Sequence, residues 1–131
     1  MQGKNSRVYG KRVFLSGPMT GLPDYNVAEF ARAHARLKEA GAKYVYNPAL
    51  TYLCQRHDVA AAKTHQDYML DCLHELTDRK KRSQGWETLV PKAYDALVRL
   101  PGWQDSDGAR MEWKVAMACG IEIIDLEEAL S

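Results

Sequence analysis

Two segments of this chain each join a short apolar run to a helix through a loop of small residues. In the first, the apolar run 13–15 leads through the glycine- and proline-containing loop 16–26 to a helical period of apolar residues over 27–40. In the second, the apolar run 96–100 leads through a loop to a helical segment over 109–119. A loop of this kind at a helix N-terminus presents backbone N–H groups to an anion. Two such loops on neighbouring parallel strands lie at one edge of a sheet, where open α/β folds bind ligands.

The rest of the chain continues this alternation of strands and helices. We expect further strands at 43–46 and 121–124, and further helices at 65–76 and 126–130. Such alternation predicts an α/β fold with a parallel sheet covered by helices on both faces. At 131 residues the chain is expected to form a single domain over 12–131, preceded by a polar, loosely held segment 1–11.

Charge and hydropathy restrict the partners that we expect. The net charge is only +1, whereas a nucleic-acid-binding domain normally carries a strongly basic footprint, so we expect no nucleic-acid polymer as partner. No apolar run has the length of a membrane span, and the first residues lack a signal-peptide pattern. We therefore expect a cytoplasmic protein without a membrane partner.

The cysteines and histidines indicate neither a metal site nor a disulfide framework, and we expect no cofactor. No two cysteines form a CxxC pair, and the histidines share no metal-ligand spacing. The residues concerned are Cys54, Cys72, Cys119, His34, His57, His65 and His74. The cysteines of the helical segments, Cys72 and Cys119, are expected to be small buried hydrophobic residues in a reducing compartment.

The loop after the run 96–100 carries the strongest candidate residues. Glu112 falls in the opening turns of the following helix, and Gly108 and Ala109 leave room for a ligand beside it. A carboxylate there either complements the helix dipole or serves as a nucleophile or base. Ser106 or Asp107 is expected to cap the helix, as Asn26 is for the first helix, and Ser106 could also donate to a phosphate.

Three more residues have two interpretations each. Asp67 and Asp71 are one helical turn apart, so their carboxylates point the same way, toward solvent or toward a substrate. Trp103 is either a lid over the site or a core residue. The residues alone thus predict a small α/β protein with an anionic-ligand site and an acidic centre.

A set of motifs in this order resembles the nucleoside 2-deoxyribosyltransferase-like superfamily. The motifs are FLSGPMTG at 14–21, NPA at 47–49, DYMLD at 67–71, DALV at 95–98, and LPGW at 100–103 followed by Ser106, Gly108-Ala109 and Glu112. The resemblance covers about residues 12–124. It is closest to a branch of small bacterial and phage proteins with a GPMTG loop and an LPGW-x-x-S-x-GA-x-x-E segment.

The resemblance implies a flavodoxin-like (Rossmann-like) sheet, a homo-oligomer, and cleavage of the N-glycosidic bond of a nucleoside or nucleotide. The glutamate matching Glu112 attacks the anomeric carbon and forms a glycosyl-enzyme, and the aspartate matching Asp71 supplies a proton to the base. The serine matching Ser106 implies a phosphorylated substrate. The substrate-binding residues would be Gly17, Pro18, Met19, Thr20, Asp67, Trp103, Ser106, Gly108 and Ala109.

The chain departs from that family pattern in two places. Phe14 stands where the better-known transferases carry a tyrosine whose hydroxyl approaches the nucleophile. An insertion over 77–93 separates the acidic helix from the next strand. We expect its basic run 79–82 to be solvated, and its apolar residues Trp86, Leu89 and Val90 to pack against the body or a second subunit. In an oligomer the insertion would lie near the mouth of the active site.

Three functions remain open at this stage. The first is a hydrolase or base transferase acting on nucleoside 5′-monophosphates, with hydrolysis favoured because no feature defines a second base site. The second is a non-catalytic module that binds a nucleotide or another phosphorylated ligand. The third is a partner-binding protein that acts through the insertion.

Overall fold

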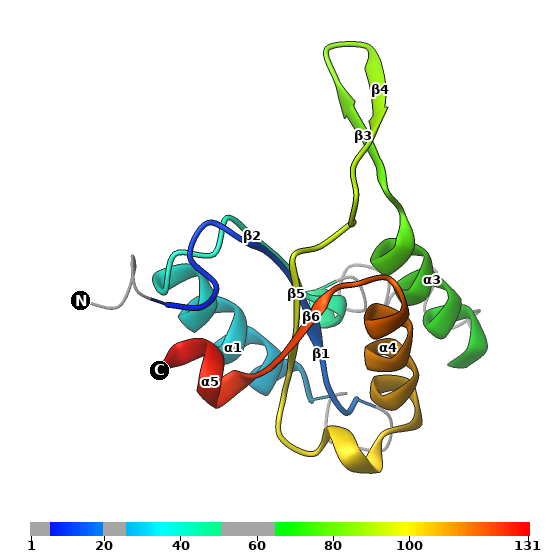
Figure 1. The fold of residues 1–131 in the computed structure, drawn as a ribbon. Coiled ribbons are helices and arrows are strands. Elements are labelled where there is room, and N and C mark those ends of the chain that lie inside the picture. The colour runs from blue at the N-terminus through cyan, green and yellow to red at the C-terminus, as the bar shows by residue number, and fades with distance from the viewer. Residues whose placement is uncertain (1–5, 20–25, 51–64) are drawn as a thin grey trace.

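The structure is a computed structural model, and it describes residues 6–19, 26–50 and 65–131 (Figure 1). Its main sheet has four parallel strands in the order β2-β1-β5-β6. The strands are β1 (Arg12–Ser16), β2 (Tyr44–Tyr46), β5 (Ala96–Arg99) and β6 (Glu122–Asp125). Because this sheet is parallel and flanked by helices, the α/β, flavodoxin-like fold expected from the sequence is confirmed.

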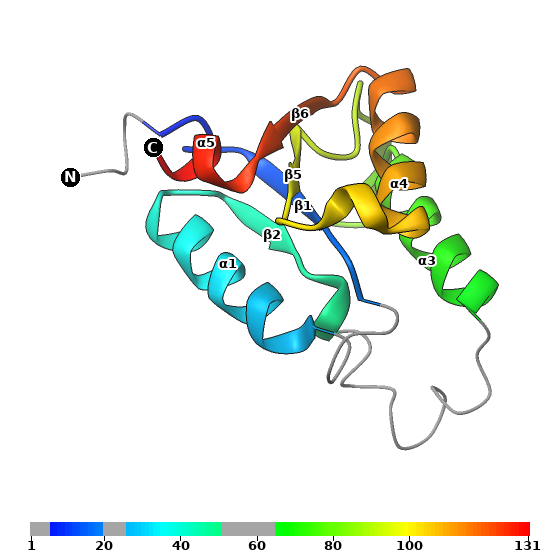
Figure 2. The same ribbon diagram turned by 90° about the horizontal axis from the view of Figure 1, so that it is seen from below.

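The helices lie on both faces of the sheet (Figures 1 and 2). One face carries α1 (Val27–Glu39) and α5 (Leu126–Leu130), and the other carries α3 (His65–Thr77) and α4 (Asp107–Ala118). Alternation along β1 divides its side chains between two cores, with Val13 and Leu15 on the α1 side and Phe14 on the α4 side. By the same alternation Ser16 shares a face with Phe14, so its hydroxyl is directed toward α4.

The insertion forms a β-hairpin that stands away from the body (Figure 1). Strand β3 (Lys80–Ser83) pairs antiparallel with β4 (Trp86–Leu89), and the turn between them has positive φ at Gln84 (52°) and Gly85 (81°). A two-residue loop in which both residues have positive φ has a backbone twist that matches the right-handed twist of the two strands it joins. Trp86 and Leu89 are 76% and 68% exposed, so in the single chain they do not pack against the body, and packing against a second subunit stays a prediction.

The hairpin also lies far from the ligand-binding edge of its own chain. It precedes the N-terminal end of β5, where the N–H of Asp95 donates to the carbonyl of Arg12 at the start of β1. The loops expected to bind ligand follow the opposite, C-terminal ends of the strands. Within one chain, therefore, the insertion does not border the mouth of the site.

Residues 6–10 are held to the body, contrary to the expectation of a loose N-terminal segment. Val8 is fully buried in the core beside α1, and the Ser6 hydroxyl donates to the carbonyl of Ala40. The Arg7 guanidinium pairs with Glu122 and Glu128. Because of these long-range contacts, the ordered body begins before β1.

Three smaller features complete the fold. Asn26 precedes α1 but does not cap it; its side-chain amide instead donates to the carbonyl of Pro18. Cys119 is exposed rather than buried, and Cys72 is partly buried, whereas Cys54 lies outside the described residues. In the parts of the chain that the structure describes, no helix combines the length and the apolar character needed to cross a membrane.

Candidate functional site

The loops that follow β1 and β5 meet at the C-terminal edge of the sheet. The Leu100 N–H donates to the Ser16 carbonyl at 2.8 Å, and this bond holds the two strand ends side by side. A Cβ atom on Gly17 would lie 2.7 Å from the Cβ of Leu100. Only glycine fits so close an approach of the two loops. The expected meeting of the two loops is therefore observed.

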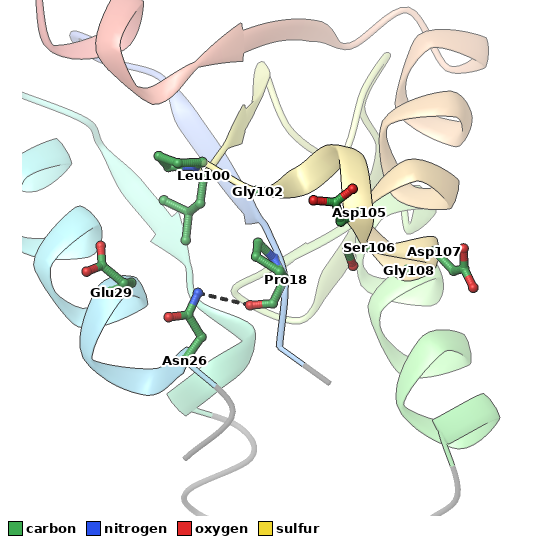
Figure 3. Close-up of a pocket in the computed structure, with 10 residues that line it drawn as sticks. Pro18, Asn26, Glu29, Leu100, Gly102, Asp105, Ser106, Asp107 and Gly108 are labelled. Carbon is green, nitrogen blue, oxygen red and sulfur yellow. Dashed lines mark hydrogen bonds between the residues drawn. The ribbon is translucent and has the colours of Figure 1, made fainter. Parts of the chain in front are cut away.

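A pocket of about 670 Å³ opens between these loops (Figure 3). Its walls come from the loop after β1, the start of α1, the loop after β5 and the start of α4. The lining residues are Pro18, Asn26, Glu29, Leu100, Pro101, Gly102, Asp105, Ser106, Asp107 and Gly108. This volume is typical of sites for small molecules of nucleotide size.

The N-terminus of α4 forms one wall of the pocket. Ser106 caps the helix as expected, because its hydroxyl oxygen accepts a hydrogen bond from the N–H of Ala109 at 3.2 Å. Within the described residues, the N–H groups of Asp107 and Gly108 have no hydrogen-bond partner. Unpaired N–H groups and the positive end of the helix dipole together favour an anion at this wall.

Carboxylates account for part of the remaining lining. Glu29 and Asp105 contribute two, while Asp107, at the α4 wall itself, is paired with Arg110. Carboxylates accept hydrogen bonds from hydroxyl and amino groups, so these side chains suit the polar groups of a sugar or base. The pocket therefore combines one wall that favours an anion with others that favour hydrogen-bond donors.

Glu112 lies one helical turn beyond Gly108 on α4 and is only 6% exposed. Its Oε1 accepts a hydrogen bond of 2.7 Å from the Ser16 hydroxyl at the end of β1, and it also interacts with the Cys72 thiol of α3. Burial raises the pKa of Glu112 to about 7, although the hydrogen bonds from Ser16 and Cys72 act in the opposite direction. At neutral pH this carboxyl group can therefore exist in both protonation states.

The partners of Glu112 were not recognised from the sequence. Cys72 lies in the apolar stripe of α3, so the pattern indicated only a small buried residue. Burial, followed by the charge of Glu112, raises the pKa of the Cys72 thiol, which therefore remains protonated and donates to the carboxylate. Ser16 is the last residue of β1. In the sequence, only the alternation of side chains along that strand indicates which face of the sheet the Ser16 hydroxyl lies on.

Asp67 and Asp71 lie on the exposed side of α3. Asp71 is adjacent in sequence to Cys72, but it is Cys72 that hydrogen-bonds to Glu112. Neither aspartate belongs to the described lining of the pocket. The structure thus brings Glu112 together with the Gly17 loop through Ser16, and leaves the two aspartates at the surface of the neighbouring helix.

Trp103 is not among the described residues that line the pocket, and it is not a fully buried core residue. It belongs to the short 3-10 helix η4 (Trp103–Asp105) and is partly buried. The Arg99 guanidinium lies 3.8 Å from the centre of its ring, and Trp113 packs against it edge-on at 6.0 Å. These contacts hold the loop that leads from β5 to α4.

The remaining candidates have different surroundings. Phe14 is buried, with its ring stacked on Tyr46 at 5.1 Å, and the hydroxyl beside Glu112 comes from Ser16. Met19 packs against the core beside α1, while Ala109 is buried in α4. Thr20 lies outside the described residues.

Across residues 6–19, 26–50 and 65–131, no three His, Cys, Asp or Glu side chains are grouped so that they could hold a metal ion. His57 lies outside these ranges.

Comparison with known proteins identifies one related family. A family model described as a domain of unknown function, DUF4406, matches residues 11–125. Neither the curated proteins nor the solved structures contain a significant match to the chain. The family match spans both loops of the pocket, the hairpin and Glu112.

Proposed function

We propose that this chain, which belongs to the DUF4406 family, cleaves the N-glycosidic bond of a nucleoside 5′-monophosphate or a related nucleotide. The observation that carries the proposal is the position of Glu112. Its buried carboxyl group is oriented by Ser16 and lies one helical turn beyond the α4 wall of a nucleotide-sized pocket. The motifs shared with the nucleoside 2-deoxyribosyltransferase-like superfamily support the same reaction.

In the proposed reaction, the Glu112 carboxylate attacks the anomeric carbon of the sugar. The bond from that carbon to the base nitrogen breaks as a glycosyl ester to Glu112 forms, and the departing base takes up a proton. Water then attacks the anomeric carbon and gives up a proton to the acid that protonated the base, which releases the sugar phosphate and restores both carboxyl groups. A carboxylate on one face of the sugar is what an oxocarbenium-like transition state requires.

The other roles follow from the resemblance and from the pocket walls. Asp71 is proposed to supply the proton to the base, and Asp67 to contact the substrate from the same helix face. The 5′-phosphate would lie at the α4 N-terminus, against Ser106 and the N–H groups of Asp107 and Gly108. Gly17, Pro18, Met19 and Thr20 would border the sugar. The reaction as proposed needs no metal or cofactor.

A homo-oligomer is a further part of the proposal, and it comes from the resemblance. Sedimentation velocity of the purified chain would test the oligomer, with a sedimenting monomer at all concentrations as the contradicting result.

A panel of ribo- and deoxyribonucleoside 5′-monophosphates tests the proposed activity. Each would be incubated with the full chain, and free base would be measured by chromatography. We expect base release from at least one monophosphate, and slower release from the matching nucleoside because the phosphate contacts are lost. Release of no base from any nucleotide or nucleoside would contradict the proposal.

The burial of Glu112 favours a second candidate, a module that binds a nucleotide without cleaving it. A carboxyl group that is 6% exposed and held by both Ser16 and Cys72 has little room to reach an anomeric carbon. Calorimetry would distinguish the two functions. Tight binding of a monophosphate without base release would favour the binding module.

A further inference from the structure

We propose that the β3–β4 hairpin and the adjoining N-terminal edge of the main sheet bind single-stranded nucleic acid. This surface is defined by Lys81 and Trp86 on the hairpin and by Arg12, Lys43 and Tyr44 at the start of β1 and β2. It lies at the opposite edge of the sheet from the pocket, so the inference goes beyond the proposed function and does not depend on it.

The first argument is the distribution of charge along the chain. Residues 79–92 contain five Lys or Arg and one Glu, a net charge of +4, whereas the whole chain carries +1 and the rest therefore carries −3. The small net charge predicts no nucleic-acid partner. A net charge is a sum over the whole molecule, however, and does not show a local basic segment, which is the electrostatic feature that a polyanion recognises.

The second argument is that cations of the body and hairpin gather together. Lys81 is close enough to Arg12 and Lys43 that, after burial, their charges are the main causes of its lowered pKa. Two carboxylates, Asp95 and Glu75, act on Lys81 in the opposite direction and offset part of this charge; they accept hydrogen bonds from the Arg12 N–H and the Tyr94 hydroxyl. Burial and the two cations outweigh them, and a bound phosphate would relieve the remaining repulsion.

The third argument is that exposed aromatic rings accompany the cations. In the hairpin register Lys81 pairs with Thr88 and Ser83 with Trp86, so Lys81 and Trp86 share a face of the ribbon. That is the face whose lysine approaches Arg12 and Lys43. Trp86 is 76% exposed and Tyr44 is 41% exposed. The Arg12 guanidinium lies 4.9 Å from the centre of the Tyr44 ring.

Cations that follow a phosphate backbone, together with rings on which bases stack, are the two components of single-strand recognition. A protein partner with an acidic surface would account for the cations but would not require an indole at the solvent-exposed end of the ribbon. Duplex nucleic acid would account for the charge alone, because its bases are already stacked and cannot lie on Trp86. The combination therefore favours a single strand.

The test is fluorescence anisotropy of a labelled oligothymidylate of about 20 nucleotides with the full chain. If about four phosphates are neutralised, raising the salt concentration from about 50 to about 200 mM weakens binding roughly 50-fold. Trp86→Ala should weaken binding by at least about fivefold because one stacked base is lost. Met111→Ala, which removes an exposed apolar side chain from α4, is the matched control and should have no effect.

A second pair of variants tests the contribution of charge to oligonucleotide binding. Lys81→Gln should reduce the slope of log K against log salt by about 0.7, the value for one phosphate contact. Lys114→Gln, an exposed lysine on α4, should leave that slope unchanged. Circular dichroism would confirm that each variant keeps the fold.

Several outcomes would overturn the inference. The first is that the oligonucleotide does not bind at about 50 mM salt. The second is that heparin binds as tightly as the oligonucleotide and Trp86→Ala does not weaken oligonucleotide binding. The third is that a duplex of the same length binds more tightly than the single strand. Self-association that is lost in Trp86→Ala, without oligonucleotide binding, would instead assign the surface to a second copy of the chain. None of these outcomes affects base release at the pocket, so the two proposals fail separately.

Discussion

The Ser16 hydroxyl at the end of β1 donates a hydrogen bond of 2.7 Å to the carboxylate of Glu112 on α4, 96 residues further along the chain. The bond joins the first strand–loop–helix unit to the second at the point where both loops open into the pocket. It provides a buried carboxylate with a fixed direction.

The raised pKa of Glu112 predicts how its replacement changes stability with pH. Between about pH 4.5 and 7 the folded protein holds a proton on Glu112 that the unfolded chain has lost, so this group lowers stability as pH rises through that range. Glu112→Gln cannot titrate. Its free energy of unfolding relative to the native chain should therefore rise by roughly 2 kcal/mol between about pH 5 and pH 8. Urea unfolding of both proteins measures this, and a pH-independent difference would contradict it.

The pH dependence of base release should follow the ionisation of Glu112. A nucleophilic carboxylate must be deprotonated, so kcat/KM should rise with pH and level off above about pH 7. Ser16→Ala removes a hydrogen bond that lowers the pKa of Glu112, so its rising limb should lie at higher pH than that of the native chain. The kcat/KM of both proteins is measured on the same substrate over the same pH range, so any ionisation of the substrate affects both profiles equally. An identical limb in the two proteins would exclude this positioning role of Ser16.

Ser106→Asp separates the helix cap from the proposed phosphate contact. Aspartate caps a helix about as well as serine, so the stability of α4 should be retained. Its negative charge would repel a phosphate at the α4 N-terminus. We expect KM for a monophosphate to rise at least about tenfold, while KM for the matching nucleoside changes little. Equal changes for both substrates would show that the phosphate binds elsewhere.

Gly17→Ala tests the packing that brings the two loops together. The new Cβ would meet the Cβ of Leu100 at 2.7 Å, and neither backbone can move without separating β1 from β5. A loss of about 1–3 kcal/mol in the free energy of unfolding is expected. Gly108→Ala is the control, because its Cβ would come closer than 3 Å only to the sulfur of Met69, which lies near the flexible end of that side chain. A smaller loss for Gly17→Ala than for Gly108→Ala would contradict the account.

The apolar periods of the sequence predicted the main sheet and its helices well. The apolar run 13–15 lies inside strand β1 (Arg12–Ser16), and the helix expected over 27–40 ends at Glu39. These elements bury one face or both, so their pattern is set by the core. Strands β3 and β4 were not predicted because their exposed faces leave no apolar alternation.

The site was only partly predictable for a related reason. The position of Glu112 after a small-residue loop is a local feature, and it identified the carboxyl group. Its contacts with Ser16 and Cys72 join segments far apart in the chain and depend on how β1, α3 and α4 pack. Cys72 is also an apolar residue by pattern, so nothing in the sequence separated its role at Glu112 from ordinary burial.

The rate of base release by Glu112→Gln tests the central claim most directly. The variant would be compared with the native chain on the best monophosphate of the panel, with Glu39→Gln as a control for loss of an exposed carboxylate. The account predicts that Glu112→Gln still folds and binds the nucleotide but releases base at least about a thousandfold more slowly, a loss of about 4 kcal/mol in transition-state stabilisation. Glu39→Gln should match the native rate. Base release by folded Glu112→Gln within about tenfold of the native rate would exclude Glu112 as the nucleophile.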